Sequence, residues 1–322
     1  MNDWKIISTA AVVPEKVVTN DELSQMMDTS DEWIKSRTGI ERRHISIGQN
    51  TSDLAAAVGR KLLAQSGWAA GDVDLIIVAT MSPDSYTPAT AARVQGKIGA
   101  DHAVAFDVSA ACSGFVYALT VASTMLKLPY FNRAMVIGSE VLSKLLDWHD
   151  RSTAVLFGDG AGGVLLSTTP DHHVLGADLA SFGDLSEKIV AGQTTVAADF
   201  PGPVTEVTPF AMDGRAVYKF ATHAVPASIR RTAADAGISL DQVDHFILHQ
   251  ANARIIRQVA RRLDQPLTKF PININEYGNT SAASEPILLA ECIEKGMVRR
   301  GETIVLAGFG GGLTTGTIII KY

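Results

Sequence analysis

The amino-acid sequence predicts an α/β protein built from two copies of one βαβαβ plan. Short, continuous apolar runs such as LIIVAT (75–80) and TIVLAG (303–308) are typical of strands that helices cover on both faces. Helical patterns lie between these runs, as in SDLAAAVGRKLLAQSG (52–67). The chain also repeats itself, because AAGDVDLIIVAT (69–80) is similar to SLDQVDHFILHQ (239–250). We therefore expect a duplicated, layered fold.

The repeat continues downstream in the same order. FDVSAACSGFVYALTVASTMLKL (106–128) is similar to NEYGNTSAASEPILLAECIEKGM (275–297), and we align Ser-Ala-Ala-Cys at 109–112 with Ser-Ala-Ala-Ser at 281–284. The strand pattern RAMVIGSE (133–140) then corresponds to GETIVLAGFG (301–310). Each half is therefore expected to carry the same strands and helices in the same sequence.

The repeat also predicts the domain organisation. Ser, Thr and Pro interrupt the pattern near residue 172, so we expect two halves, 1–172 and 173–322. The first half contains a segment that the second lacks, 141–156, and such extra segments usually build binding sites or interfaces. A Gly- and Pro-rich stretch at about 182–215 is expected to lie at the surface.

The first long helix has clear end signals. Ser52 or Asp53 is expected to be its N-cap, because short polar side chains accept hydrogen bonds from the first free N–H groups. Gly67 is expected to end it, since glycine adopts the left-handed conformation that closes many helices.

Composition excludes several functional classes. The chain has 322 residues, 46% of them apolar, which is enough for one large core or two smaller ones. No apolar run approaches the roughly 20 residues that a membrane helix needs. The net charge of −6 argues against general nucleic-acid binding. The start, MNDWKIISTA, lacks a secretory pattern and there are only two cysteines, so we expect a cytoplasmic protein without membrane partners.

Cys112 is the strongest candidate for a nucleophile. It follows an apolar strand pattern and a turn of small residues, and a long apolar helix pattern begins at it. The unpaired N–H groups of a helix N-terminus favour thiolate over thiol, so we expect a lowered pKa for Cys112. The alternative, a buried cysteine in the core, fits this segment about equally well.

Three further features lie where strands of the second half end. His249 follows the run HFIL, and Asn279 lies in NEYGNTSAASEP. The loop LAGFGGG contains Gly308, Gly310, Gly311 and Gly312. Active sites of open α/β sheets lie at the carboxyl ends of strands, and a glycine loop lets backbone N–H groups approach a substrate oxyanion. Each feature alone is more often structural, but their joint placement with Cys112 favours an active site.

Other motifs point to no site. GDGAGG (158–163) fits a dinucleotide fingerprint, but the strand pattern VLLSTT follows it where that fingerprint needs a helix. His245 and His249 share a strand pattern without the helical spacing of a zinc site, so we expect no metal. Cys292 lies in an apolar helix pattern and is expected in the core.

Together, Cys112 in SAACSGF, His249 in HQAN, Asn279 in GNTSAAS and the GFGGG loop resemble the β-ketoacyl-acyl-carrier-protein synthase III family, the starter condensing enzymes of the thiolase superfamily. The resemblance covers nearly the whole chain, including DEWIKSRTGIERR, FGDGAGG and the segment RAVYKFA near residue 218. Chain-elongating relatives use Cys-His-His and true thiolases use Cys-His-Cys, so Asn279 favours the starter type. The implied fold is thiolase-like, with α/β/α/β/α layers.

The resemblance implies the reaction and its groups. Cys112 would take an acyl group from acyl-CoA, with the backbone N–H groups of Cys112 and Gly311 holding the oxyanion. Malonyl-acyl-carrier protein would then lose CO₂, with His249 and Asn279 stabilising the enolate, and no cofactor would be needed. Trp33, Arg37, Arg151 and Asn252 would hold CoA. The carrier protein would dock on a basic region made of Lys219, Gln250, Arg254, Arg257 and Arg261.

The sequence leaves several questions open. The resemblance implies a homodimer, with the strand FDVSAA at its interface. A condensing enzyme of polyketide assembly and a non-catalytic carrier-binding homologue are the alternatives, while a nicotinamide oxidoreductase lacks its motif context. Acyl-chain preference depends on the pocket near Tyr86, Leu142 and Phe157, and the sequence does not fix it. Glu285 departs from the family pattern, with no assigned effect.

Overall fold

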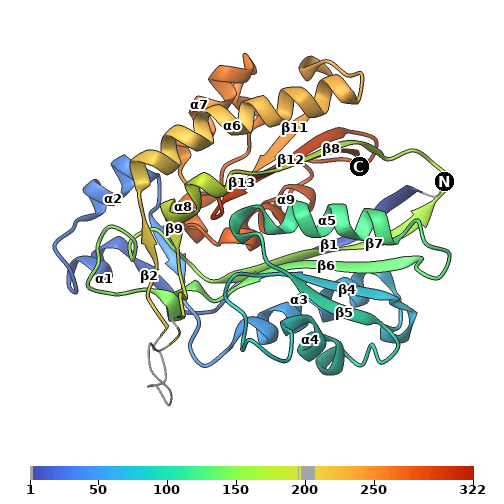
Figure 1. The fold of residues 1–322 in the computed structure, drawn as a ribbon, viewed down its shortest axis with the longest axis horizontal. Coiled ribbons are helices and arrows are strands. Elements are labelled where there is room, and N and C mark those ends of the chain that lie inside the picture. The colour runs from blue at the N-terminus through green and yellow to red at the C-terminus, as the bar shows by residue number, and fades with distance from the viewer. Residues whose placement is uncertain (1–2, 195, 197–206) are drawn as a thin grey trace.

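The structure, a computed structural model that describes residues 3–194, 196 and 207–322, has five layers (Figure 1). Two sheets enclose a central layer of helices, and each sheet carries further helices on its outer face. This arrangement confirms the predicted α/β/α/β/α architecture. The outer layers contain α3 (Thr51–Ser66), α4 (Thr90–Ile98), α6 (Gly214–Asp235) and α7 (Ala253–Leu263), and the central layer contains α5 (Gly114–Met125) and α9 (Ser284–Glu294).

Each half of the chain supplies one sheet. The strand orders are β1-β7-β6-β4-β5 and β11-β12-β13-β8. The first contains β1 (Asp3–Val12), β4 (Leu75–Ala79), β5 (Val104–Val108), β6 (Arg133–Glu140) and β7 (Gly160–Thr169); the second contains β8 (Val174–Ser181), β11 (His245–Leu248), β12 (Thr303–Gly310) and β13 (Thr314–Lys321). Strands β4, β5 and β6 are parallel, as are β11 and β12, whereas β7 and β13 run antiparallel to their neighbours.

Between residues 70–140 and residues 240–310, the two halves correspond with an offset of 170 residues. Strand β4 begins at Leu75 and β11 at His245, while the 3₁₀ turns η2 (Ala111–Ser113) and η7 (Ser281–Ala283) begin at Ala111 and Ser281. Both turns start with a residue in the left-handed region, φ 45° at Ala111 and φ 48° at Ser281. The alignment of 109–112 with 281–284 is therefore wrong by two residues, because backbone geometry fixes the register and the repeated small residues do not.

The halves differ most after their third common strand. Strand β6 ends at Glu140 and β7 begins at Gly160, whereas β12 ends at Gly310 and β13 begins at Thr314. The extra segment of the first half includes the 3₁₀ turn η3 (Leu142–Leu145). Position 172 lies in the connection between β7 and β8.

The central helices are largely apolar and mostly buried because a sheet covers each of two faces. Helix α5 packs Phe115 and Leu119 into a core that also contains Leu288 and Leu289 of α9. Cys292 is 2% exposed in the same core, as predicted. The core therefore lies between the halves, and it fixes the ends of both helices relative to both sheets.

Helix α3 begins two residues earlier than its sequence suggests. Asn50 is the N-cap, and Asp53 completes a capping box as the third helical residue. The prediction of Ser52 or Asp53 as N-cap is therefore wrong, because several neighbouring polar residues can cap and only the backbone selects one. Gly67 ends the helix in the left-handed conformation, as predicted.

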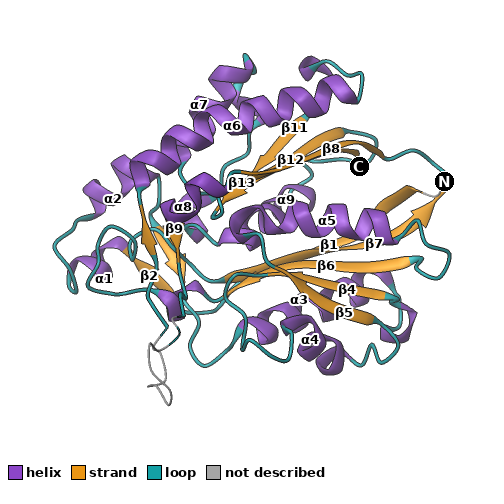
Figure 2. Ribbon diagram, viewed as in Figure 1, coloured by secondary structure: helices purple, strands orange, loops and turns teal. Residues whose placement is uncertain are grey.

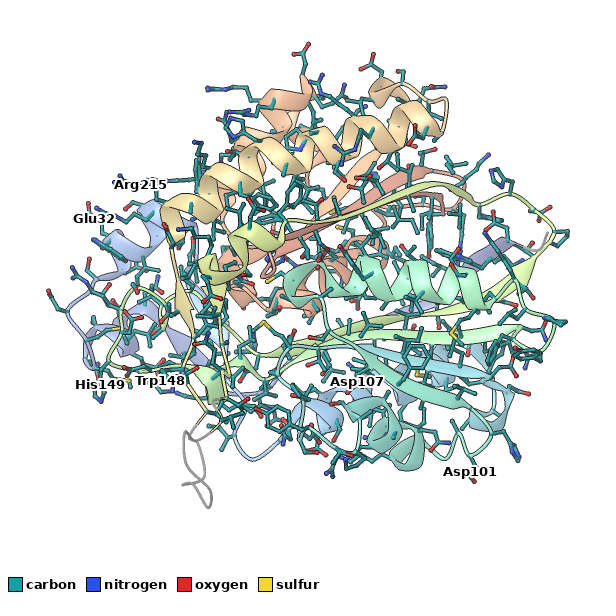
Figure 3. All side chains as sticks on the ribbon, viewed as in Figure 1. Glu32, Asp101, Asp107, Trp148, His149 and Arg215 are labelled. Atoms are coloured by element: carbon teal, nitrogen blue, oxygen red, sulfur yellow. The ribbon has the colours of Figure 1, made fainter. Side chains whose placement is uncertain are left out.

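Additional elements gather at one end of the molecule, opposite the two termini (Figures 1 and 2). They are α1 (Asn20–Ser24), α2 (Asp31–Thr38), α8 (Ile274–Tyr277), β2 (Val17–Thr19), β3 (Arg42–His44), β9 (Ile189–Val190) and β10 (Ala211–Met212). Trp148 and His149 of the extra segment lie at this end with Glu32 of α2 and Arg215 of α6 (Figure 3). Of the predicted loop 182–215, residue 195 and residues 197–206 lie outside the described part. No helix in the described residues is long and apolar enough to cross a membrane.

Candidate active site

Cys112 lies in the sharp turn η2 between β5 and α5. The left-handed conformation of Ala111 bends the chain, and α5 begins two residues after the cysteine. Ser113 fixes the turn, since its hydroxyl donates to Ala110 O at 2.8 Å and lies 2.7 Å from Thr314 Oγ1 of the other half. The Cys112 side chain is only 6% exposed. The turn thus holds the thiol at a helix N-terminus, where the two halves meet.

Cys112, His249 and Asn279 line one cavity of about 220 Å³. The residues come from η2, from the end of β11 and from the loop after α8, so the duplicated fold brings them together. Apolar side chains form most of the remaining wall: Leu156, Phe157, Ile189, Phe210, Met212, Val217, Ile255 and Phe309. A small number of polar groups therefore converges in an otherwise apolar pocket, the usual form of a small-molecule site.

His249 is held by its backbone and by its ring. Its N–H donates to Ala307 O at 2.9 Å, which extends the pairing of β11 with β12 by one residue. Its Nδ1 lies 2.6 Å from Ser284 Oγ, and its ring packs edge-on against Phe309 with the centroids 5.1 Å apart. Burial lowers the pKa of His249 to about 3, so the imidazole is neutral at physiological pH.

Asn279 presents its amide as a donor. Its Oδ1 accepts a hydrogen bond from the backbone N–H of Ser281 at 2.9 Å, and this contact fixes which end of the amide is oxygen. Its backbone pairs with the end of the extra segment, through Leu156 O at 2.9 Å and Gly158 N at 3.0 Å. The NH₂ group is therefore the end of the amide that remains for a ligand.

Two glycines of β12 permit the close approach of the nucleophile turn. A Cβ on Gly310 would lie 2.7 Å from Cys112 N, and one on Gly308 would lie 2.8 Å from Ser113 Cα. Gly310 lines the cavity with Cys112. Gly311 lies one residue farther on and borders the neighbouring depression with Ala111 and Ile189. The structure thus places Gly310 against the cysteine and Gly311 beside the turn that precedes it.

The expected lowering of the Cys112 pKa is wrong. Burial raises the pKa of Cys112 to about 12, and the nearby carboxyl groups of Glu140 and Glu285 act in the same direction. Desolvation therefore outweighs the helix N-terminus, because the thiolate would have almost no water around it. Sequence reasoning could not anticipate this, since burial depends on the other half of the chain.

Trp33, Arg37 and Arg151 form a cluster at the additional elements. The guanidinium of Arg37 lies 4.6 Å from the Trp33 ring and that of Arg151 lies 5.5 Å from it. Arg151 also donates to Asp28. Asn252 connects this cluster to the cavity, because it lines the cavity and its Nδ2 donates to Arg37 O at 3.1 Å. The structure thus brings together all four residues predicted to hold CoA.

Helix α7 has the predicted amphipathic form. Ile255, Ile256, Val259 and Leu263 are buried, and Arg254, Arg257 and Arg261 are exposed. Arg254 is not free, since its guanidinium donates to Ser36 O at 2.6 Å. Lys219 is exposed on α6 and lines a separate apolar depression with Phe220 and His223.

Gln250 does not belong to this surface. Its side chain is 1% exposed, Nε2 donates to Leu248 O at 2.8 Å, and Oε1 accepts from Asn273 N at 3.2 Å. The prediction of a docking role for its side chain is therefore wrong, because the residue after His249 turns inward to close the end of β11.

Of the three residues expected near the acyl pocket, Phe157 and Leu142 lie at the cavity or pack behind it, and Tyr86 does not. Phe157 lines the cavity, and Leu142 packs against Phe157 and Phe210 in one cluster. Tyr86 is 77% exposed, so it does not line the cavity of its own chain.

Sequence reasoning missed Ser284 and left Glu285 without a role. Ser284 contacts His249 as described above, and Glu285 is completely buried beside it. The signal for Ser284 is present in the small-residue turn GNTSAAS, but an alignment two residues out of register hides it.

Within the described residues, no group of three or more His, Cys, Asp or Glu could hold a metal ion. The segment GDGAGG (158–163) leads into strand β7 and not into a helix, as expected, so it lacks the context of a dinucleotide-binding motif.

Comparison with known proteins gives a consistent result. Residues 106–183 match the family model for 3-oxoacyl-[acyl-carrier-protein] synthase III, and residues 233–322 match the model for its C-terminal part. The chain is 60% identical to the beta-ketoacyl-[acyl-carrier-protein] synthase III of Limosilactobacillus reuteri, with 100% of both chains covered. It is 51% identical to that of Streptococcus pneumoniae, with 98% of both covered.

Solved structures show the same fold. The 3-oxoacyl-[acyl-carrier-protein] synthase III of Aquifex aeolicus superposes with a TM-score of 0.92 at 40% identity, covering 99% of this chain and 100% of the other. The priming β-ketosynthase of the R1128 polyketide pathway also superposes with a TM-score of 0.92, at 28% identity and with 99% and 96% covered.

Proposed function

The chain belongs to the β-ketoacyl-acyl-carrier-protein synthase III family, and from this membership we propose how its site residues divide the reaction. As a member of that family it is an acyltransferase that initiates fatty-acid synthesis by a condensation on acyl-carrier protein. The observation that supports the division of roles is the shared cavity of Cys112, His249 and Asn279. A thiol nucleophile and two neutral hydrogen-bond donors are the groups that such a condensation needs.

Cys112 is the nucleophile of the first half-reaction. Its sulfur attacks the thioester carbonyl of an acyl-CoA such as acetyl-CoA, and the C–S bond to CoA breaks. The thiol proton of Cys112 leaves with the CoA sulfur, so the products are an acyl-Cys112 thioester and free CoA. The backbone N–H groups of Cys112 and Gly311 hold the oxyanion of the tetrahedral intermediate. The close contact of the Gly310 backbone with Cys112 fixes the geometry of this turn.

His249 and Asn279 act in the second half-reaction. Malonyl-acyl-carrier protein loses CO₂, and the electron pair of the broken C–C bond forms an enolate on its thioester. The neutral ring of His249 and the NH₂ group of Asn279 donate hydrogen bonds to the enolate oxygen. The enolate carbon attacks the acyl-Cys112 carbonyl, and the C–S bond to Cys112 breaks. Cys112 leaves as a thiolate and takes up a proton from solvent, so the products are a β-ketoacyl-acyl-carrier protein, CO₂ and the free thiol enzyme.

CoA enters across the additional elements. The Trp33 ring, with Arg37 and Arg151 against it, offers an aromatic and cationic surface for an adenine and its phosphates. Asn252 lies between this cluster and Cys112, in reach of the pantetheine arm. Residues from both halves of the chain therefore form the path to the nucleophile.

The acyl-carrier protein docks on the exposed arginines of α7 and on Lys219 of α6, the helix that packs against α7. Arg257 and Arg261 are exposed, and α7 begins directly after Asn252 at the cavity. A basic helix on a chain of net charge −6 suits an acidic partner, because complementary charge orients the encounter.

The active molecule is a homodimer in the cytoplasm. Strand β5 lies at one edge of the five-stranded sheet, and Val104 on it is 48% exposed. Pairing of β5 with β5 of a second copy would cover this edge. Both cysteines are free, and the reaction needs Cys112 as a thiol, which a reducing compartment provides.

The test is product formation by the purified protein. With an acyl-CoA and malonyl-acyl-carrier protein, the expected product is a carrier protein whose mass equals that of the β-ketoacyl form, with one CO₂ released per product. Cys112→Ala should abolish it, and Cys292→Ala should leave it unchanged. Carrier-bound product formed equally well by Cys112→Ala would contradict the proposal, and so would a wild-type protein that forms no product from any acyl-CoA.

A further inference from the structure

Glu285 lies buried directly behind the nucleophile turn. It is 0% exposed, at the start of α9. A Cβ placed on Gly308 would lie 2.5 Å from Glu285 Oε1 and 3.0 Å from Cys112 O, so the carboxyl group fills the space where β12 approaches the turn. The described residues offer Oε1 no hydrogen-bond partner. A carboxyl group in such a place needs a specific explanation, because burying it is costly.

A chain of short contacts connects Glu285 to the ring of His249. Glu285 Oε2 lies 3.0 Å from Ser284 Oγ, and Ser284 Oγ lies 2.6 Å from His249 Nδ1. The backbone N–H of Gln250 also donates to Ser284 Oγ, at 3.3 Å. Because Nδ1 is engaged in this chain, Nε2 is the ring nitrogen that remains for the cavity.

The donors and acceptors of Ser284 allow two arrangements in which every proton of the chain is hydrogen-bonded. A hydroxyl donates one hydrogen bond and accepts two, and the N–H of Gln250 always occupies one acceptor position. If Glu285 is ionised, Ser284 donates to it and accepts from His249, so the histidine proton is on Nδ1. If Glu285 is neutral, its O–H donates to Ser284, Ser284 donates to Nδ1, and the histidine proton is on Nε2.

Burial selects the neutral arrangement. It raises the pKa of the Glu285 carboxyl well above its ordinary value, and in the described residues no cation offsets this effect. The other ionisable groups near Cys112 do not supply a positive charge. Burial raises the pKa of Glu140 to about 7, that of the Cys112 thiol to about 12, and lowers that of His249 to about 3. A carboxylate would therefore be an unpaired charge in the interior.

The first half of the chain has no such polar chain at the corresponding positions. With the offset of 170 residues, His249, Ser284 and Glu285 correspond to Ala79, Gly114 and Phe115. A Cβ on Gly114 would lie 3.3 Å from the Cβ of Ala79, so these positions face each other in the first half as well. The fold packs without polar side chains there, and the polar chain is a property of the half that supplies His249.

We propose that Glu285 is a positioning residue that sets the tautomer of His249: its neutral carboxyl donates to Ser284, Ser284 donates to Nδ1, and Nε2 carries the proton that faces the cavity. The inference rests on the proposed role of His249 as a donor to the enolate, which requires a proton on Nε2. With that tautomer His249 cannot act as a base toward Cys112, which agrees with the assignment of its role to the second half-reaction.

The test reads the tautomer directly in the resting protein. Nitrogen-15 NMR of histidine-labelled protein, with the His249 signals assigned by their loss in His249→Ala, shows which ring nitrogen carries the proton. Infrared difference spectra between the wild type and Glu285→Gln show whether the Glu285 carboxyl is protonated. At neutral pH we expect a protonated carboxyl band and a proton on Nε2. Glu285→Gln, an isosteric neutral donor, should keep the proton on Nε2 and retain both half-reactions.

Raising the pH provides the second arm. At the pH where the carboxyl band disappears, the proton of His249 should shift from Nε2 to Nδ1 in the wild type. Glu285→Gln should show no such shift. In Ser284→Ala, loss of the carboxyl band should no longer be accompanied by a shift of the His249 proton. A carboxylate at neutral pH, a proton on Nδ1 at neutral pH, or loss of the band without change at His249 would overturn the proposal. These readouts need no turnover, so they stand even if the wild type fails to condense malonyl-acyl-carrier protein, a result that would reject only the proposed function.

Discussion

At the scale of single residues, burial decides the chemistry of the site. Cys112, His249 and Glu285 are almost completely buried. Desolvation raises the pKa of Cys112 and of Glu285 and lowers that of His249, and each shift favours the neutral form. Desolvation therefore disfavours a formal charge on each of the three side chains. A site with little fixed negative charge suits these thioester substrates, since negative charge develops on the oxyanion and on the enolate that the donors are placed to hold.

The raised pKa of Cys112 has a direct consequence for alkylation. Because the pKa lies near 12 in the folded protein, the thiolate fraction, and with it the rate of reaction with iodoacetamide, should keep rising with pH above 9. The measurement is peptide-resolved mass spectrometry over a pH series, with urea-unfolded protein as the reference, in which the same cysteine should level off near its ordinary pKa of about 8.5. A plateau near neutral pH in the folded protein would contradict the burial argument.

The division of roles predicts unequal losses from His249→Ala and Asn279→Ala. Each removes a donor to the enolate, so each should lower the condensation rate about a hundredfold or more. Acylation of Cys112 by acyl-CoA should survive better in both variants, because neither donor holds that oxyanion. Single-turnover assays of each half-reaction separate the two steps. Equal losses in both half-reactions would show that the roles are assigned wrongly.

At the scale of elements, the same turn is used twice with different content. Turns η2 and η7 both begin with a left-handed residue and both lead into a central helix. Each seats against a glycine of the opposite half: a Cβ on Gly138 of β6 would lie 2.0 Å from Ala282 O, and one on Gly308 of β12 would lie 3.0 Å from Cys112 O. One turn carries the nucleophile, and the other positions Asn279 before it and Ser284 after it.

The basic face of α7 predicts a selective effect on the protein substrate. Arg257→Glu together with Arg261→Glu should raise the KM for malonyl-acyl-carrier protein about tenfold, since charge reversal repels an acidic partner. The KM for acyl-CoA should change little. Arg254 stays unchanged in this design because it also holds α2 through Ser36 O.

A matched control places the same two charge changes elsewhere. Arg60→Glu on α3 and Lys127→Glu after α5 alter exposed positions far from the cavity. Steady-state assays that vary one substrate at a time give both KM values. If the control raises the KM for the carrier protein as much as the α7 variant does, net charge and not docking explains the effect.

The sequence predicted the elements better than their exact register. Periodic apolar runs and glycine signals predicted strands covered by helices, the duplication and Gly67, because these features depend on local physics. The order of the five layers was implied by the family resemblance. The N-cap at Asn50 and the correspondence of Cys112 with Ala282 depend on backbone angles that several small or polar residues permit. The contact of His249 with Ser284 joins positions 35 residues apart, so no local pattern could reveal it. The inward turn of Gln250 is a tertiary effect of the same kind.

At the scale of the whole molecule, duplication places one site between two halves that are not equivalent. Both halves contribute to the cavity, and the elements that extend beyond the repeat gather at the end where the cavity lies (Figure 1). The opposite end carries the termini. One of the sheet edges is strand β5, which comes directly before the nucleophile turn.

That edge predicts how the chain associates. Light scattering coupled to size exclusion should give twice the chain mass for the wild type. Val104→Glu should shift the equilibrium toward the monomer, because two-fold pairing of β5 would bring like charges together. Met297→Glu, at a similarly exposed apolar residue (45% against 48% for Val104), is the matched control and should stay dimeric. A monomeric wild type would reject the β5 pairing.

Detection of the acyl-enzyme would establish Cys112 as the nucleophile. The protein is incubated with a series of acyl-CoA thioesters, measured by intact-protein mass spectrometry, and mapped by peptide analysis before and after addition of malonyl-acyl-carrier protein. We expect one acyl group on Cys112 that disappears when the carrier-protein substrate is added, with the order of starters set by the cavity around Phe157. No adduct with any acyl-CoA, or an adduct at another residue that the malonyl substrate discharges, would contradict this role of Cys112.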